Sequence, residues 1–202
     1  MPLDKREKQW RAIKRFDQQN MRCCTQALAK QYHAKFPDHG AAWFRYGISL
    51  YAVARYSEAL AALRRAARLC PPNKLHLVQY HFGHLYQQRG SYRRAEPWFR
   101  RAIASCPSHS TSYIYLGALL ALEGRLAEAE VVHRQATLCK EGCIDEAFLN
   151  LGLVLRALER YSDTRKCFQR ALAIDPKYKE AAKELTDVER VIKLNRNACH
   201  AL

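Results

Sequence analysis

The sequence contains few of the residues that interrupt helices or form flexible connections. Among its 202 residues there are 8 glycines and 7 prolines. This scarcity leaves little room for long flexible linkers. Apolar residues make up 49% of the chain and charged residues 26%, which is ordinary for a folded chain. We therefore expect one continuous, helix-rich body.

Long apolar segments are missing as well. The longest apolar run, Tyr113 to Leu122, is too short to cross a bilayer. The first fifteen residues contain no apolar core of a secretory signal. We therefore expect a reducing, cytoplasmic location in which the 8 cysteines stay as free thiols.

The patterns that mark metal sites and catalytic sites are also absent. Cys139 and Cys143 have three residues between them and His133 upstream, but no second cysteine pair lies at the spacing of a zinc finger. The histidines are scattered, and no glycine-rich phosphate loop is present. We expect no metal, no cofactor and no enzymatic activity.

Acidic residues are few compared with basic ones. The chain has 19 Asp and Glu against 34 Lys and Arg, a formal net charge of +15. Such a balance fits an anionic partner, which could be an acidic protein face, RNA or an anionic membrane surface. It fits a solvated, repulsive surface equally well.

What the sequence does contain is a repeat with a period of about 35 residues. One column of the repeat is glycine, at Gly47, Gly83, Gly117 and Gly152. A second column is alanine, at Ala66, Ala102, Ala136 and Ala171. Both columns advance by 36, 34 and 35 residues, so they keep the same register. A period of this length is typical of helical repeat arrays.

The full set of repeated positions resembles the tetratricopeptide repeat (TPR) family, whose pattern is W-x2-L-G-x2-Y, then A-x3-F, then Pro. The first repeat matches this pattern at Trp43, Gly47, Ala59 and Pro71. The second matches it at Gly83, Tyr86, Ala95, Phe99 and Pro107. The resemblance implies an all-α fold, a right-handed solenoid of antiparallel helix pairs.

The register predicts the organisation of the chain. Four repeats are expected at residues 40–73, 76–109, 110–143 and 145–178. Residues 1–39 are expected to form a helical hairpin that is a degenerate repeat or a cap. Residues 179–202 are expected to form a capping helix and tail, because Ala181, Ala182, Leu185, Val188 and Ile192 give this segment one apolar stripe. The alternative is that residues 195–202, or part of the helix, fold back as a ligand of the array itself.

Some positions depart from the pattern. His133 stands where the other repeats have Leu63, Phe99 and Phe168, and Thr164 stands where they have alanine. The first repeat has two extra residues and the third has one, which we assign to the turns between repeats. Pro97 lies inside a predicted second helix, where it should remove one hydrogen bond.

The resemblance also implies a groove lined by the first helices of the repeats. Its residues should lie at fixed offsets from each glycine, and most of them are apolar here. The predicted peptide-binding groove comprises Phe44, Ile48, Tyr51, Leu77, Tyr80, His84, Gln87, Ile114, Ala118, Leu149, Asn150, Leu153 and Arg156, and the same offsets also give Ala41, Thr111, Ala121 and Glu146. For Phe44, Ile114 and Leu149, a place in the core is an equal alternative.

An apolar groove predicts a protein partner that supplies an apolar peptide or an amphipathic helix. The array would then be a non-catalytic interaction scaffold or adaptor. The clamp by which some TPR proteins hold acidic chaperone tails is not expected, because Phe44 and Ile48 stand where that clamp has Lys and Asn.

The alternative function is RNA binding through a basic outer face. Arginines recur just before the alanine column on the second helices, at Arg64, Arg65, Arg100, Arg101, Arg134 and Arg170. A ladder of this kind could follow a phosphate backbone. A solvated outer face is the competing interpretation. Self-association through either terminal segment is a third possibility, and the sequence leaves the oligomeric state open.

Overall fold

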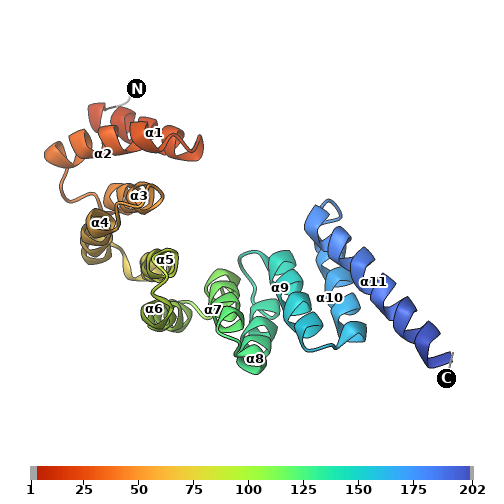
Figure 1. Cartoon of the computed structure of the whole chain (residues 1–202). Coiled ribbons are helices and arrows are strands. Elements are labelled where there is room, and N and C mark those ends of the chain that lie inside the picture. The colour runs from red at the N-terminus through yellow and green to blue at the C-terminus, as the bar shows by residue number, and fades with distance from the viewer. Residues whose placement is uncertain (1–3, 201–202) are drawn as a thin grey trace. The chain divides into compact units, whose positions relative to one another are not determined.

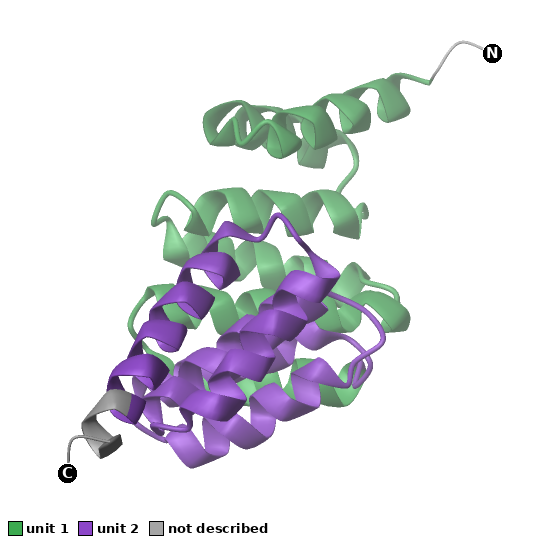
Figure 2. Cartoon of the chain, turned by 90° about the vertical axis from the view of Figure 1, so that its right-hand side faces the viewer, with its two compact units in different colours: residues 1–105 green, residues 106–202 purple. Residues whose placement is uncertain are grey.

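The computed structural model describes residues 4–200, with side chains described for residues 4–196. Over this range the chain is made of α-helices joined by short turns (Figure 1). It divides into two compact units, residues 1–105 and 106–202, shown in different colours in Figure 2. The composition had suggested one continuous body, and nothing in the sequence marked residue 105 as a boundary.

The first unit, called unit 1, contains three helical hairpins. Its helices are α1 (Lys5–Gln18), α2 (Arg22–Lys35), α3 (Gly40–Tyr51), α4 (Tyr56–Leu69), α5 (Leu75–Gln88) and α6 (Tyr92–Ser105). A short 3₁₀ helix, η1 (Pro72–Lys74), connects α4 to α5. It lies in the inter-repeat turn to which we had assigned the two extra residues of the first repeat.

The second unit, called unit 2, contains two hairpins and a final helix. Its helices are α7 (Ser110–Leu122), α8 (Leu126–Thr137), α9 (Ile144–Ala157), α10 (Tyr161–Ile174) and α11 (Lys179–His200). In the third repeat, Glu141 and Gly142 replace the closing proline, and Glu141 forms a short parallel bridge with His109. The main-chain N–H of Ser110 donates to the carbonyl oxygen of Glu141 at 2.9 Å.

All five hairpins use the same turn. Its central residue has a positive φ angle, and these residues are Asn20, Ala54, Gly90, Gly124 and Glu159. The next N–H then donates to a carbonyl five residues earlier, as from Met21 to Phe16 at 2.9 Å. This bond closes a helix end in the Schellman manner. Because α1 and α2 share the turn of the repeats, the turn favours a degenerate repeat over an unrelated cap for the N-terminal hairpin.

Helix α11 packs along α10 at the end of unit 2. Its residues Ala181 and Val188 are buried and Leu185 and Ile192 are half-buried, in one cluster with Phe168 of α10 and Leu149 of α9. Ala182 is exposed and so lies outside the predicted stripe. Up to Ile192 the helix is therefore packed against the neighbouring helices of unit 2. The predicted self-ligand role reaches Ala201 and Leu202, which lie outside the described residues.

Pro97 is inside α6 and does not end it.

The predicted all-α fold of stacked antiparallel helix pairs is confirmed within each unit.

Candidate ligand-binding surfaces

Each repeat is held together where a glycine of its first helix meets a large side chain of its second. A Cβ atom added to any of these glycines would lie between 2.4 and 2.9 Å from that side chain, which is too close for a real contact. The pairs are Gly47 with Leu63, Gly83 with Phe99, Gly117 with His133 and Gly152 with Phe168. This close crossing fixes where the neighbouring first-helix side chains lie.

In unit 1 the first helices leave a small apolar slot. It has a volume of about 80 Å³ and is bounded by Phe44 of α3, Ala66 of α4, Cys70 just after α4, and Leu77 and Val78 of α5. Its wall is almost wholly apolar, so it would accept no more than part of one apolar side chain.

Beside this slot, aromatic rings and histidines pack on one another. The hydroxyl of Tyr51 and Nδ1 of His81 are hydrogen-bonded at 2.6 Å. The His81 ring meets Phe44 edge-on, with ring centroids 4.9 Å apart, and it meets Tyr80 at 4.7 Å. Burial lowers the pKa of His81 to about 3, so the ring is neutral at pH 7. The cluster therefore presents aromatic and neutral polar surface rather than charge.

In unit 2 a larger open cavity of about 400 Å³ lies among α7, α8 and α9. Its wall is mostly aliphatic, and no charged side chain lines it. The lining residues are Ala118, Ala121, Leu122, Leu126, His133, Asn150, Leu153, Val154 and Ala157. Leu122 at its edge is 67% exposed.

The predicted groove residues fall into three groups. Phe44, Ile48, Leu77, Tyr80, His84, Gln87, Ala118, Asn150 and Leu153 are half-buried and keep some exposed surface. Tyr51, Ile114 and Leu149 are buried, so in this structure they support the surface from below. Arg156 is also half-buried and forms an ion pair with Glu184 of α11.

The fixed offsets from each glycine, called the offset rule below, did not identify every residue of the unit 2 cavity. They missed the residues on the second helix α8 and those near the C-terminal ends of α7 and α9. These residues are Leu122, Leu126, His133, Val154 and Ala157. The departure of His133 from the apolar column was the one sequence signal that pointed to this place.

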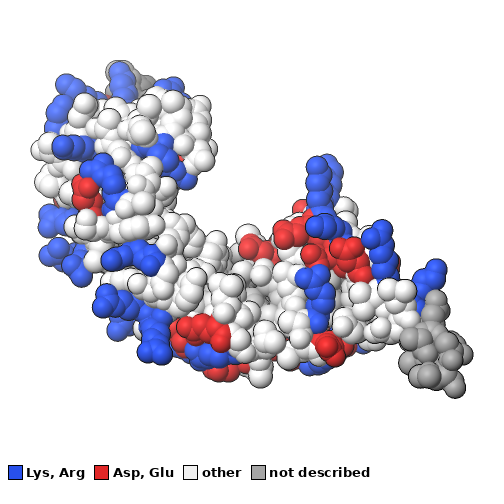
Figure 3. All heavy atoms as spheres, viewed as in Figure 1, with Lys and Arg blue, Asp and Glu red and all other residues white. Residues whose placement is uncertain are grey.

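The excess of positive over negative charge is confined almost entirely to unit 1. Residues 1–105 contain 20 Lys and Arg against 6 Asp and Glu, a net charge of +14. Residues 106–202 contain 14 Lys and Arg against 13 Asp and Glu, a net charge of +1. Figure 3 shows basic side chains over the helices of unit 1 and a mixture of both signs over unit 2.

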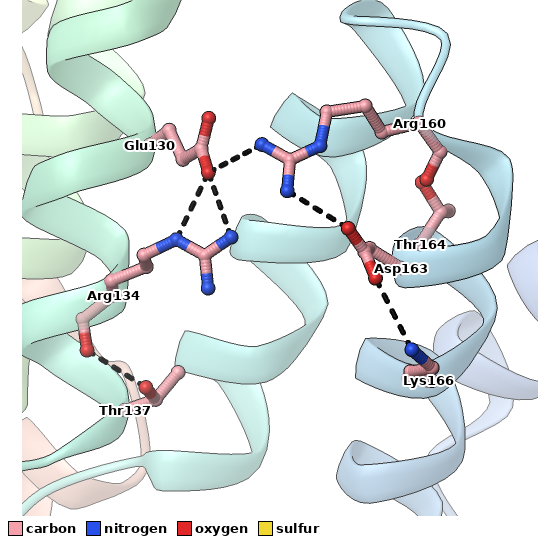
Figure 4. Close-up of polar contacts among 7 residues, drawn as sticks. All are labelled: Glu130, Arg134, Thr137, Arg160, Asp163, Thr164 and Lys166. Carbon is pink, nitrogen blue, oxygen red and sulfur yellow. Dashed lines mark hydrogen bonds and ion pairs between the residues drawn. The ribbon is translucent and has the colours of Figure 1, made fainter.

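The predicted basic face spans both units, and only some of its arginines have carboxylate partners. All six of its arginines are exposed. Within the described residues of unit 1, Arg64 and Arg65 make no ion pair, Arg101 lies over the Trp98 ring at 4.8 Å, and Arg100 pairs with Glu96. In unit 2, Arg134 bonds to Glu130, which also accepts from Arg160, as Figure 4 shows. On α4 and α6 the ladder is thus free of ion pairs except at Arg100. In unit 2, Arg134 of α8 is neutralised by Glu130, whereas Arg170 of α10 makes no ion pair with the described residues.

The described part of the chain contains neither a metal site nor a membrane-spanning helix. No group of three or more His, Cys, Asp or Glu side chains there could hold a metal ion. None of the helices in this part combines the length and the apolar character needed to cross a membrane.

Comparison with known proteins matches most of this chain to one family. Family models described as tetratricopeptide repeat match residues 24–74 and 80–134 and residues 145–178. A human relative, tetratricopeptide repeat protein 7B, is 32% identical over 123 residues, which is 61% of this chain and 14% of that protein. This chain therefore spans only a small part of that relative.

Solved structures show the same fold at low sequence identity. The anaphase-promoting complex hetero-tetramer Cut9–Hcn1 superposes with a TM-score of 0.70 at 16% identity, over 94% of this chain and 41% of that one. YrrB, described as a TPR protein with an unusual peptide-binding site, superposes with a TM-score of 0.59 at 20% identity, over 85% of this chain and 87% of that one.

Proposed function

Because the chain belongs to the tetratricopeptide repeat family, we propose that it is a non-catalytic interaction scaffold and that unit 2 holds an apolar segment of a partner protein. The observation that carries this proposal is the open cavity of about 400 Å³ among α7, α8 and α9. Proteins of this family generally act as interaction scaffolds, and the similar protein YrrB is described as having a peptide-binding site.

The wall of the cavity specifies the chemistry of its occupant. No charged side chain lines it, and Leu122, Leu126 and Leu153 surround it with aliphatic surface. Burying such a surface stabilises a complex by about 25 cal/mol per Å². An apolar peptide or the apolar face of a helix therefore fits better than an acidic tail.

The chain's own C-terminal helix does not line this cavity as far as its described side chains extend. Residues of α11 pack against α10 and α9, through Val188, Leu185 and the Arg156–Glu184 ion pair. The described side chains of α11 therefore leave this apolar surface open, and we propose that a segment of another protein covers it. The smaller slot of unit 1, with Phe44 and Leu77, would accept only part of an apolar side chain.

A charge placed on the cavity wall should abolish this binding. We expect Leu153→Asp to weaken peptides selected from a phage-displayed library on the full chain by tenfold or more, because the carboxylate would have to be desolvated. The matched control is Leu138→Asp, since Leu138 is 82% exposed and lies away from the cavity. Selected peptides that bind both variants as tightly as the parent chain would exclude the cavity as their site.

The division of charge favours RNA binding by unit 1 as a second candidate function. Its outer helices α4 and α6 carry unpaired arginines, while the corresponding Arg134 of unit 2 is neutralised by Glu130. Arginines without carboxylate partners can release counterions from a phosphate backbone when they bind it.

This second candidate makes a prediction about salt. Binding of a single-stranded uridine 20-mer, measured by fluorescence anisotropy, should weaken steeply between 50 and 200 mM salt. Replacing Arg64, Arg65 and Arg101 with Gln should reduce the slope of log K against log salt by about 2, since each phosphate contact on single strands contributes roughly 0.7. Arg134→Gln serves as the control and should leave the slope unchanged. Binding that ignores salt, or no binding at all, would eliminate RNA as the partner.

A further inference from the structure

His133 is a polar residue in a place that the other repeats fill with hydrocarbon. Leu63, Phe99 and Phe168 occupy the corresponding position, each against the glycine of its repeat. The His133 side chain is only 1% exposed, and its ring lies on Gly117, with Nε2 2.5 Å from where a Cβ would be. A buried polar group at such a crossing normally has a hydrogen-bond partner.

The His133 ring has no such partner in the described structure. Nδ1 is buried and accepts or donates no hydrogen bond. Burial lowers the pKa of His133 to about 4, so at pH 7 the ring is neutral and has one donor and one acceptor nitrogen. The hydrogen-bonding capacity of the imidazole is therefore unused by the chain itself.

The same ring lines the apolar cavity of unit 2. Three alanines, Ala118, Ala121 and Ala157, leave the space in front of it open. Cavities of about 150 Å³ with apolar walls are known to hold a benzene ring, so a cavity of about 400 Å³ has room for an aromatic side chain. Asn150 adds a second polar group, because its Nδ2 donates to the carbonyl oxygen of Glu146 at 2.9 Å while its Oδ1 accepts no hydrogen bond from the described residues.

We propose that this cavity takes an aromatic side chain that carries one N–H or O–H group, a tryptophan or tyrosine of the partner segment, and that His133 selects it. This inference rests on the proposed function of unit 2. Tryptophan and tyrosine combine a large apolar body with a single polar group that needs a partner when buried. They are also the side chains that most often anchor protein interfaces.

Selection follows from the cost of leaving a polar group unpaired. A phenylalanine or leucine could fill the cavity, but it would cover the imidazole without bonding to it. A site with a buried polar group discriminates against ligands that cannot pair with that group. We expect a preference of about tenfold for the ligand with the hydrogen-bonding group, since one such bond contributes on the order of that factor.

Two small probes of equal size separate the roles of shape and hydrogen bonding. Indole and indene differ in having N–H in place of CH₂. The full chain, labelled with ¹³C in alanine methyl groups and ¹⁵N in histidine, would be titrated with each probe by NMR. Indole should shift the methyl signals of Ala118 and Ala121 and the ring nitrogens of His133, and it should bind about tenfold more tightly than indene.

The variant His133→Leu provides the decisive control. Leucine is the residue at the corresponding position of the first repeat, so the helix crossing should be retained, as circular dichroism would verify. In this variant indole and indene should bind equally. If that variant fails to fold, the ¹⁵N shift of the His133 ring in the parent chain carries the test.

Equal affinity of the parent chain for both probes, with shifted alanine methyl groups, would overturn the role of His133 and leave the apolar cavity as a binding site. No methyl shift with either probe would overturn the aromatic occupant. Failure of the proposed function is a separate result, in which selected peptides bind Leu153→Asp unchanged.

Discussion

Replacing Phe168 with alanine is expected to lower the free energy of unfolding of unit 2 by about 3–5 kcal/mol. The Phe168 ring is fully buried, at 0% exposure, and it lies directly on Gly152 of the paired helix. It also contacts the cluster that joins α9 and α10 to Ala181 and Val188 of α11. Its loss would leave a cavity at the place where three helices meet.

The measurement is urea unfolding followed by circular dichroism at 222 nm. Leu138→Ala is the matched control, because Leu138 is exposed and surface truncations usually change stability by less than about 0.5 kcal/mol. If Phe168→Ala and Leu138→Ala shifted the unfolding midpoint equally, Phe168 would not be part of a cooperative core.

As the pH is lowered, unit 1 is expected to begin losing stability above the pH range in which most of its carboxylates become protonated. Burial lowers the pKa of His33 to about 4 and that of His81 to about 3, while an unfolded histidine titrates near 6.5. Between these values the unfolded chain binds protons that the folded chain does not. The stability that these neutral histidines contribute to the folded state is therefore fully present above pH 6.5 and is lost as the pH falls toward 4.

Each buried histidine should contribute a loss of roughly 2–3 kcal/mol between pH 7 and pH 4.5. Tryptophan fluorescence reports the unfolding of unit 1, because Trp10, Trp43 and Trp98 all belong to that unit. The ring of Trp43 stacks on His33 with centroids 3.7 Å apart. The urea midpoint should fall steeply over this range, and a midpoint that stayed constant would contradict the prediction.

His33→Phe is the variant that tests the cause. Phenylalanine can keep the stacking on Trp43 but cannot be protonated. Its unfolding midpoint should depend less on pH than that of the parent chain, by an amount equal to the His33 contribution. An unchanged pH dependence would assign the acid sensitivity of unit 1 to other groups, such as His81.

The helix pairs and their crossings could be predicted from the sequence because they depend on contacts within one repeat. The spacing of Gly47 and Leu63 already implied that a missing side chain on one helix admits a large one from the next. The structure confirms this contact in all four repeats. Such contacts follow from helix periodicity alone.

The open surface could not be predicted in the same way, because it depends on how neighbouring helix pairs pack. Phe44 and Leu149 stand at the same offset from their glycines. Phe44 keeps exposed surface, whereas Leu149 is buried in the cluster that includes Ala181 and Val188 of α11. Ile114 is buried as well, on α7, which packs directly against α9. The offset rule gives a direction for each side chain but not the distance to the next element.

The distribution of charge was likewise invisible in the total. A net charge of +15 suggested a basic protein, yet nearly all of the excess belongs to unit 1. The boundary between the units is set by three-dimensional contacts, and the charge of the two parts can be compared only once that boundary is known. We therefore expect an anionic partner to bind α4 and α6 rather than the whole chain.

The glycine crossings have a consequence for how such an array can change during evolution. Opposite a glycine, the second helix carries leucine, phenylalanine or histidine, and the helix pair forms in every case. Each repeat contacts only its neighbours, so an exchange at this one position leaves distant repeats untouched. A single substitution there can give one repeat a new chemical preference while the scaffold around it stays the same, and His133 is an example of such a substitution.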